Sequence, residues 1–229
     1  MSKDRSKCAY CGRPASTSDH VPPESLFTPP RPSNLITVPA CGDCNHGASD
    51  DDEVFRNELT IMAGSFRESA NAAERLQPTM RAILRKRATR ENIVSAAKPV
   101  ERYSMGGIYL GRGYAVPLNS DAHKRVLTRI VRGLYWNQTG NSLANDVHID
   151  LMSIDKTTPN WQAIFDIPRR LRLQNVFVGD GDTFQYFWGN ARDDPIRSVW
   201  LLMFFKGPSA QIILATTSMA RSGTELETA

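Results

Sequence analysis

Two Cys-x-x-Cys pairs near the start of the chain restrict its fold more than any other feature. Cys8 and Cys11 form the first pair, and Cys41 and Cys44 follow after 29 intervening residues. Four thiolates with this spacing are typical of a tetrahedral zinc site in which each pair supplies two sulfur ligands. Because four sulfurs leave no coordination position for water, the expected Zn²⁺ is structural, and it would fold a segment that is poor in apolar residues.

The composition is that of an ordinary globular chain and excludes several classes of protein. Of the 229 residues, 41% are hydrophobic and 23% are charged, which is typical of neither a disordered chain nor a membrane protein. No apolar run reaches the ~18 residues of a membrane-spanning helix, and the start of the sequence lacks the apolar core of a signal peptide. We therefore expect a cytoplasmic protein with no membrane partner.

The first hundred residues divide into a cysteine-bearing unit and a helical connector. Residues 1–60 hold the cysteine pairs and end in a helix, for which Ser49 is the expected N-cap, followed by acidic residues that favour the helix dipole. Helical spacing of apolar residues continues over 61–98. Pro78 is expected to separate two helices there, because proline disrupts a helix interior.

The second half of the chain predicts a different architecture. Residues 99–220 show strand-like alternation around a helix over 120–135, which predicts a mixed α+β domain with an antiparallel sheet. The stretch GDGD at 179–182 is predicted to be a hairpin turn, not a phosphate loop, because no helix follows it. Residues 221–229 are predicted to form a disordered tail. The fold class is therefore α+β.

Three side chains close to the cysteine pairs have the chemistry of a hydrolytic site. Asp19 and His20 lie between the pairs, and Asn45 directly follows the last cysteine. Asp and Asn provide hard oxygen ligands suited to Mg²⁺ or Mn²⁺, and histidine is suited to general-base catalysis near neutral pH. A base beside a hard cation suggests hydrolysis of phosphodiester bonds.

The motifs CAYC, DHVPP and NLITVPACGDCN, in this order, resemble the HNH or ββα-metal endonucleases, in particular the subset with a four-cysteine zinc knuckle. The resemblance covers about residues 8–60. It implies an enzyme that cleaves nucleic acid to leave a 5′-phosphate and a 3′-hydroxyl. DNA is the expected substrate, and RNA is the alternative. The stretch RIVRGLYWNQTG also resembles bacterial proteins that join this nuclease type to an α+β extension, and this likeness implies no activity.

The resemblance assigns a role to four residues. His20 matches the base that activates water, and Asp19 matches a ligand of the catalytic cation, Mg²⁺ or Mn²⁺, on the same strand with its side chain on the other side. Asn45 matches the asparagine that provides the second oxygen ligand. Asn34, 14 residues after His20, matches the asparagine that ties the hairpin loop and takes no part in the chemistry.

The sequence also departs from the family pattern. Many members have a His or Lys ligand four residues after the position of Asn45, where this chain has Ser49. The cation would then have two protein ligands, with water and phosphate oxygens completing the shell, as is common for Mg²⁺. His46 and Asp50 are alternative ligands.

A basic stretch is the expected contact with the nucleic-acid backbone. Arg81, Arg85, Lys86, Arg87 and Arg90 carry five positive charges without an acid among them, in a chain of net charge +4. Phosphate contacts of this kind supply affinity without reading sequence. The alternative for these residues is a solvated helix face.

Other hypotheses stay open at this point. The competing function is a non-catalytic zinc ribbon that binds nucleic acid or protein. A homodimer would suit a double-strand cut, although no residue indicates one. His123 and His148 have no evident partners and are expected to be ordinary residues. The aromatic residues of the second half, such as Tyr186 and Trp200, are expected to fill a core in preference to binding bases.

Overall fold

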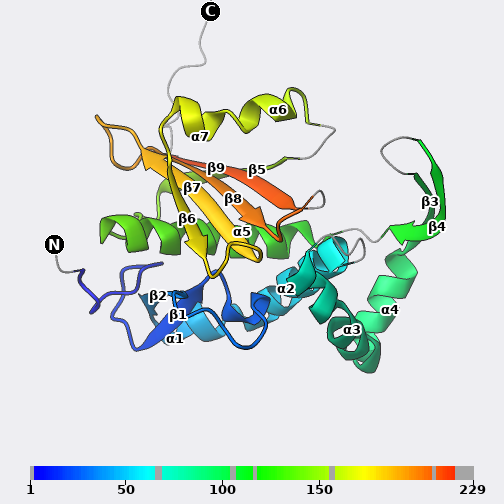
Figure 1. The fold of residues 1–229 in the computed structure, drawn as a ribbon. Helices are drawn as coiled ribbons and strands as arrows, with labels where there is room; N and C mark the ends of the chain where they lie inside the picture. Colours follow the sequence, from blue (N-terminus) through cyan, green and yellow to red (C-terminus); the bar gives the residue numbers. More distant parts are fainter. Residues whose placement is uncertain are drawn as a thin grey trace, which may run out of the picture.

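A central helix, α5 (Ser120–Thr139), lies between the cysteine-bearing segment and a five-stranded sheet (Figure 1). The structure is a computed structural model that describes residues 3–64, 69–103, 107–115, 118–154, 158–207 and 210–219. The predicted tail at 221–229 lies outside the described residues. The layers, from one side of the molecule to the other, are α6 and α7, the sheet, α5, and the N-terminal elements (Figure 1).

The elements before α5 are as follows: β1 Thr17–Val21, the 3-10 helix η1 Glu24–Leu26, β2 Ile36–Ala40, α1 Gly42–His46, α2 Ser49–Gly64, α3 Ala70–Arg85, α4 Arg87–Ala96, β3 Lys98–Tyr103 and β4 Tyr109–Ala115. Those after α5 are β5 Val147–Ile154, α6 Trp161–Ile164, α7 Ile167–Arg170, β6 Gln174–Val178, β7 Phe184–Asn190, β8 Ser198–Phe204 and β9 Gln211–Met219.

The N-terminal strands form a short antiparallel hairpin that leads into helices. In its register Asp19 lies opposite Val38, and His20 lies opposite Thr37. The helices α1 and α2 follow directly, so the order is strand, strand, helix. β3 and β4 form a second hairpin, which projects beyond α4 (Figure 1).

The C-terminal strands form one sheet in the order β5-β9-β8-β7-β6, and every neighbouring pair is antiparallel. This confirms the prediction of an α+β fold with an antiparallel sheet. The GDGD stretch connects β6 to β7 as the predicted hairpin turn, and Gly179 and Gly181 have φ angles of 67° and 79°. Glycine accepts this left-handed region at little steric cost.

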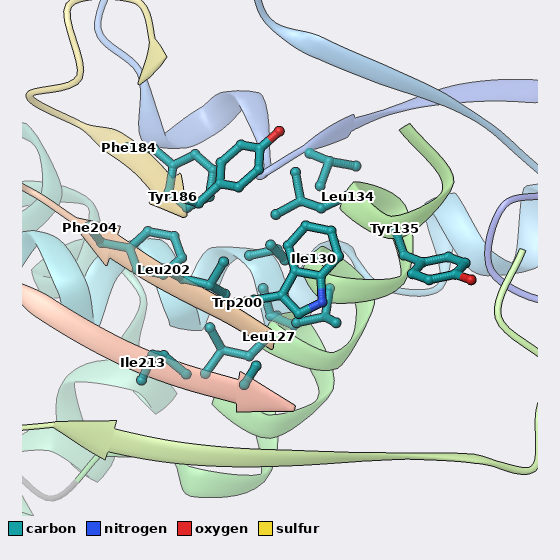
Figure 2. Packing of buried hydrophobic residues seen from close by; sticks show 14 of the residues in the cluster. Leu127, Ile130, Leu134, Tyr135, Phe184, Tyr186, Trp200, Leu202, Phe204 and Ile213 are labelled. Carbon is teal, nitrogen blue, oxygen red and sulfur yellow. The ribbon is translucent and has the colours of Figure 1, made fainter. Parts of the chain in front are cut away.

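One face of the sheet packs on α5 and forms the main core. Figure 2 shows Ile130 and Leu134 of α5 against Trp200 of β8, with Phe184 and Tyr186 of β7 beside them. These side chains are almost completely buried, and each contributes about 1.5–3 kcal/mol by leaving water. The aromatic residues of this face fill a core, as predicted. Phe187 points to the other face and packs in a smaller cluster with Ile154, Ile164 and Leu201.

The opposite side of α5 packs on the N-terminal hairpin, so both halves of the chain share one hydrophobic cluster that includes Cys8, Phe55 and Trp200. Gly133 marks the closest approach. A Cβ atom at this position would lie 2.6 Å from Cγ2 of Val21 and 3.3 Å from Cε1 of Tyr10. Only glycine therefore permits this helix to lie so close to the hairpin.

The prediction that Pro78 separates two helices is wrong, because Pro78 lies inside α3. α2 ends at Gly64, and α3 begins after Ser69, whose hydroxyl accepts a hydrogen bond from the backbone N–H of Ala72 at 3.2 Å. Pro78 is exposed, and water can reach the carbonyl that its missing N–H leaves free. Ser49 begins α2 as expected, but its hydroxyl donates to the carbonyl of His46 at 3.0 Å instead of capping the helix.

Within the described residues, no helix combines the length and the apolar character that crossing a bilayer requires.

Candidate functional site

The four cysteines come together at the base of the hairpin. Their Sγ atoms all lie within 4.8 Å of one another, and those of Cys11 and Cys41 are 3.7 Å apart. A zinc ion with Zn–S bonds of about 2.3 Å requires sulfurs about 3.8 Å apart in a tetrahedron. The donor set therefore fits zinc. Among the described residues, no other group of three or more His, Cys, Asp and Glu side chains forms a cluster that could hold a metal.

Local backbone geometry positions both cysteine pairs. The first pair turns through Gly12, which has a φ angle of 73° and donates its N–H to the carbonyl of Cys8 at 2.9 Å. The second pair begins α1, where the N–H of Asn45 donates to the carbonyl of Cys41 at 3.1 Å. The N–H of Ala9 donates to the carbonyl of Pro39 at 2.8 Å and joins the first turn to β2.

Arg13 places positive charge beside the sulfurs. Its guanidinium donates to Sγ of Cys11 at 3.4 Å and to Sγ of Cys41 at 3.5 Å. Burial opposes ionisation of Cys11, but hydrogen bonds from Arg13, and then from Cys44 and Cys8, outweigh it and lower the pKa of that thiol to about 6. Burial raises the pKa of Cys44. Metal binding requires thiolates, and the charge of Arg13 favours the thiolate form of Cys11.

His20 lies on the side of β1 that faces η1. Its side chain is 33% exposed, and its Nδ1 atom lies 3.8 Å from Oε2 of Glu24. The same Glu24 oxygen lies 3.3 Å from Nη1 of Arg31. The histidine ring is therefore accessible to solvent and has a carboxylate on one side.

Asp19 points the other way, as alternation along a strand requires. Its side chain is buried, and Oδ2 accepts a hydrogen bond from the hydroxyl of Tyr10 at 2.7 Å. Nε of Arg129 lies 3.6 Å from the same oxygen, while Oδ1 accepts from the backbone N–H of His20 at 2.8 Å. Burial and the charge of Asp19 raise the pKa of Tyr10, which keeps the phenol protonated as a donor.

The two predicted asparagines contact different parts of the fold. Asn45 of α1 donates from Nδ2 to Oγ1 of Thr17 at 3.1 Å and to the carbonyl of Ser18 at 3.2 Å, and it therefore joins the helix to β1. Asn34 reaches across the molecule to the β6–β7 turn. It donates to the carbonyl of Phe177 at 3.1 Å and accepts from the N–H of Gly179 at 2.7 Å.

The donors predicted for Mg²⁺ or Mn²⁺ fit only in part. Both oxygens of Asp19 already accept hydrogen bonds, and Arg129 supplies the positive charge beside them. Oδ1 of Asn45 accepts no hydrogen bond from the described residues, whereas each oxygen of Asp19 accepts one and keeps a further lone pair. Within the described chain, no hydrogen bond joins the side chain of one of Asp19, His20 and Asn45 to the side chain of another, and only the backbone N–H of His20 contacts Asp19. The positive charge of Arg129 would oppose the binding of a cation to Asp19.

Arginines of α5 are the part of this region that sequence reasoning missed. Arg129 is only 12% exposed and donates from Nη2 to Oδ2 of Asp52 at 2.6 Å, and Arg125 forms a bidentate pair with Asp51 at 2.6 and 2.7 Å. The hydrogen bond to Asp52 raises the pKa of Arg129 despite its burial. The available signal was the spacing of Arg125 and Arg129, four residues apart on one helix face.

A cavity of about 210 Å³ lies beside these ion pairs, between α1, α2 and α5. It is lined by Asp43, Cys44, Gly47, Ala48, Asp51, Arg125, Val126 and Arg129. None of the three residues predicted for the chemistry lines it.

No family model matches this chain. Searches of curated proteins and of solved structures find no significant match either. Assignment of function to this site therefore rests on the motifs and on the geometry described above.

Several members of the predicted basic stretch have partners. Nζ of Lys86 lies 2.6 Å from Glu53, Arg87 pairs with Glu91 at 2.8 Å, and Arg90 lies 3.5 Å from the carbonyl of Leu84. The remaining two residues, Arg81 and Arg85, are exposed and pair with no carboxylate in the described part of the chain.

The remaining histidines differ in their surroundings. The expectation that His123 and His148 lack partners is wrong. Nε2 of His123 lies 2.7 Å from Oε2 of Glu58 in a buried pair, because α5 packs on α2, and His148 pairs with Asp150 at 2.9 Å on the surface. His46 is exposed at the end of α1, and Asp50 is exposed in the first turn of α2.

Proposed function

We propose that this protein is an HNH-type endonuclease that hydrolyses phosphodiester bonds of DNA, with His20 as the general base. The observation that carries the proposal is the position of His20 on a hairpin that the cysteine cluster braces, partly open to solvent and with a carboxylate 3.8 Å from Nδ1. The motifs that resemble the HNH family support the same role.

Glu24 gives His20 the environment of a base. A carboxylate beside one ring nitrogen stabilises the imidazolium that forms when the other nitrogen takes a proton. His20 would remove a proton from water, and the resulting hydroxide would attack phosphorus in line with the bond to the 3′-oxygen. The phosphorus–oxygen bond would break to leave a 5′-phosphate, and the 3′-oxygen would take a proton from water.

The proposal includes a divalent cation, Mg²⁺ or Mn²⁺, on Asp19 and Asn45. Carboxylate and amide oxygens have the right chemistry for such an ion, which would neutralise charge on the phosphate when bound. Since Arg129 and Tyr10 already contact Asp19, the charge of the guanidinium would oppose the binding of this cation. Proton transfer to His20 is independent of which groups hold the cation.

A plasmid-cleavage assay tests the proposal. His20→Ala should reduce nicking by about 10²- to 10⁴-fold, the usual contribution of a general base. His148→Ala is the matched control, because His148 is an exposed histidine beside a carboxylate on the far sheet. Reactions with Mg²⁺, with Mn²⁺ and without a divalent cation, at constant zinc content, test the cation. Equal cleavage by parent and His20→Ala would exclude His20 as the base.

One observation favours a second candidate, a non-catalytic zinc-stabilised module that binds DNA. The contacts of Asp19 with Tyr10 and Arg129 are those of a structural residue at a packing interface. The same assay separates the two functions, because the module would bind DNA and leave it uncut with every cation.

A further inference from the structure

Three arginines gather on the side of the hairpin that carries His20. Arg31 lies in the loop between η1 and β2, Arg56 on α2 and Arg75 on α3. We call them the arginine cluster. The packing of α2 on η1 and on α3, and the hydrogen bond from Arg75 to Phe27 directly after η1, bring their segments together. Burial, and then the positive charges of Arg56 and Arg31, lower the pKa of Arg75.

The carboxylates near this cluster form a direct ion pair with only one of its members, although Glu53 interacts with the charge of Arg56 and Glu74 with that of Arg75. Arg56 donates from Nε and Nη2 to the uncharged amide oxygen of Asn57 at 3.2 and 2.9 Å. Arg75 donates from Nη1 to the carbonyl of Phe27 at 2.7 Å. Neither forms an ion pair with a carboxylate of the described residues. Only Arg31 does, with Glu24 at 3.3 Å.

One donor of the cluster is buried and unused. The Nε atom of Arg75 is shielded from solvent and has no hydrogen-bond partner in the described chain. A buried donor without an acceptor costs free energy, as does a group of like charges. A phosphate from outside would reach the shielded Nε atom only after a shift of the side chain, but it would offset the repulsion between the positive charges, and guanidinium groups match the geometry of phosphate oxygens.

Glu24 connects this cluster to the proposed base. One of its oxygens lies 3.3 Å from Nη1 of Arg31 and 3.8 Å from Nδ1 of His20. A phosphate on Arg31 would therefore lie on the same side of β1 as the histidine, and not on the side of Asp19 and Arg129.

We propose that Arg31, Arg56 and Arg75 form the site that binds a backbone phosphate of duplex DNA and positions the strand at His20. This inference rests on the proposed function, whose substrate it locates. It adds a second site to the predicted phosphate contacts of the basic stretch of α3 and α4. The arginines are positioning residues, and His20 carries the chemistry.

Binding can be tested separately from cleavage. The protein carries His20→Ala so that the DNA stays intact, and fluorescence anisotropy measures the affinity for a labelled 30-base-pair duplex over a range of salt concentrations. Arg56→Gln and Arg75→Gln should each weaken binding about 5-fold or more and reduce the slope of log K against log salt by about 1, the effect of one lost phosphate contact.

Two controls keep the result specific. Arg169→Gln removes an arginine of α7, which is 84% exposed and lies on the far side of the sheet from α3 (Figure 1), and it should leave affinity and slope unchanged. Arg75→Lys retains the charge and should restore most of the affinity, and zinc content and thermal unfolding show that each variant is folded.

The outcomes are distinct. Parental affinity and slope in Arg56→Gln and Arg75→Gln would overturn the inference, even if the parent protein cleaves DNA. Weakened binding in these variants, together with no cleavage by the parent, would support the phosphate site and exclude the nuclease. If the variants lose binding of inorganic phosphate and keep their duplex affinity, the cluster is a site for free phosphate and the inference is wrong.

Discussion

Nε of Arg129 lies 3.6 Å from the carboxylate of Asp19, which is 110 positions earlier in the sequence. The same guanidinium binds Asp52 at 2.6 Å, so one cation of α5 serves two carboxylates, one on the hairpin and one on α2. Because these side chains are largely buried, the ion pairs stabilise the fold only while Arg129, Asp19 and Asp52 all carry their charges. Loss of one charge would leave another buried without a partner. The contact fixes Asp19 in place and also competes with any cation that would bind there.

Replacement of Arg129 should therefore destabilise the fold. Arg129→Gln leaves Asp19 and Asp52 without a counter-charge in a site where Arg129 is only 12% exposed, and we expect a loss of about 3–5 kcal/mol in urea unfolding. Arg125→Gln breaks an ion pair whose arginine is 60% exposed and should cost less than about 1 kcal/mol. Equal effects of the two variants would contradict this ranking.

Loss of a cysteine should affect more than the N-terminal segment. Cys44→Ala should reduce the zinc content from about one ion per chain to near zero, because three thiolates leave the structural site open. Since Cys8 and Trp200 belong to the same hydrophobic cluster, we expect one lowered unfolding transition for the whole protein. Elemental analysis measures the zinc and calorimetry measures the transition. A retained zinc ion or an unchanged midpoint would contradict this expectation.

Gly133→Ala should destabilise the protein although alanine favours helices. The intrinsic gain is about 1 kcal/mol, whereas the new methyl group would lie 2.6 Å from Cγ2 of Val21. Such overpacking costs about 1–3 kcal/mol, so we expect a net loss in denaturant unfolding. Gly42→Ala is the matched control, because a Cβ atom there would lie 4.0 Å from Cδ2 of His46, an ordinary van der Waals distance. A more stable Gly133→Ala variant would show that α5 can move away from the hairpin.

Acid should weaken the contact between α2 and α5. The hydrogen bonds from Arg125 lower the pKa of Asp51. The pKa of this aspartate is about 3.9 in the unfolded chain and lower in the folded protein. The ion pair therefore stabilises the fold fully above about pH 3.9, and this stabilisation is lost as the pH falls through the lower pKa of the folded protein. Asp51→Asn should therefore be less stable than the parent at pH 7 and should approach it near pH 3. If the difference in stability between the parent and Asp51→Asn does not become smaller below pH 4, the Asp51–Arg125 ion pair is not its cause.

The local patterns of the sequence were sufficient for the secondary structure of the second half. Alternation predicted the strands and their antiparallel hairpins, and apolar spacing predicted α5 from Ser120 onward. These signals are local, since each depends on residues within one element. Pro78 shows the limit of such reasoning, because a proline on an exposed helix face is tolerated when water can reach the carbonyl that it leaves free.

The candidate site was predictable only in part. The cysteine cluster followed from spacing, because two short turns with two sulfurs each can close around one ion. The motif predicted that Asp19 belongs to the site. No motif predicted that Arg129 and Tyr10 would contact its carboxylate. The hydrogen-bond partners of Asn34 were not predictable either, because Phe177 and Gly179 belong to a turn more than 140 residues later in the chain.

By itself, the sequence determined the four cysteines that form the cluster, most helices and strands of the second half, and the placement of His20 and Asp19 on opposite sides of one strand. All three depend on spacing along a few neighbouring residues. Tertiary structure alone decided which charge faces Asp19, where Asn34 binds, and that three arginines from a loop and two helices gather beside His20. These contacts join segments far apart in the chain, and they form only because α5 and the helices pack on the hairpin to bury one common core.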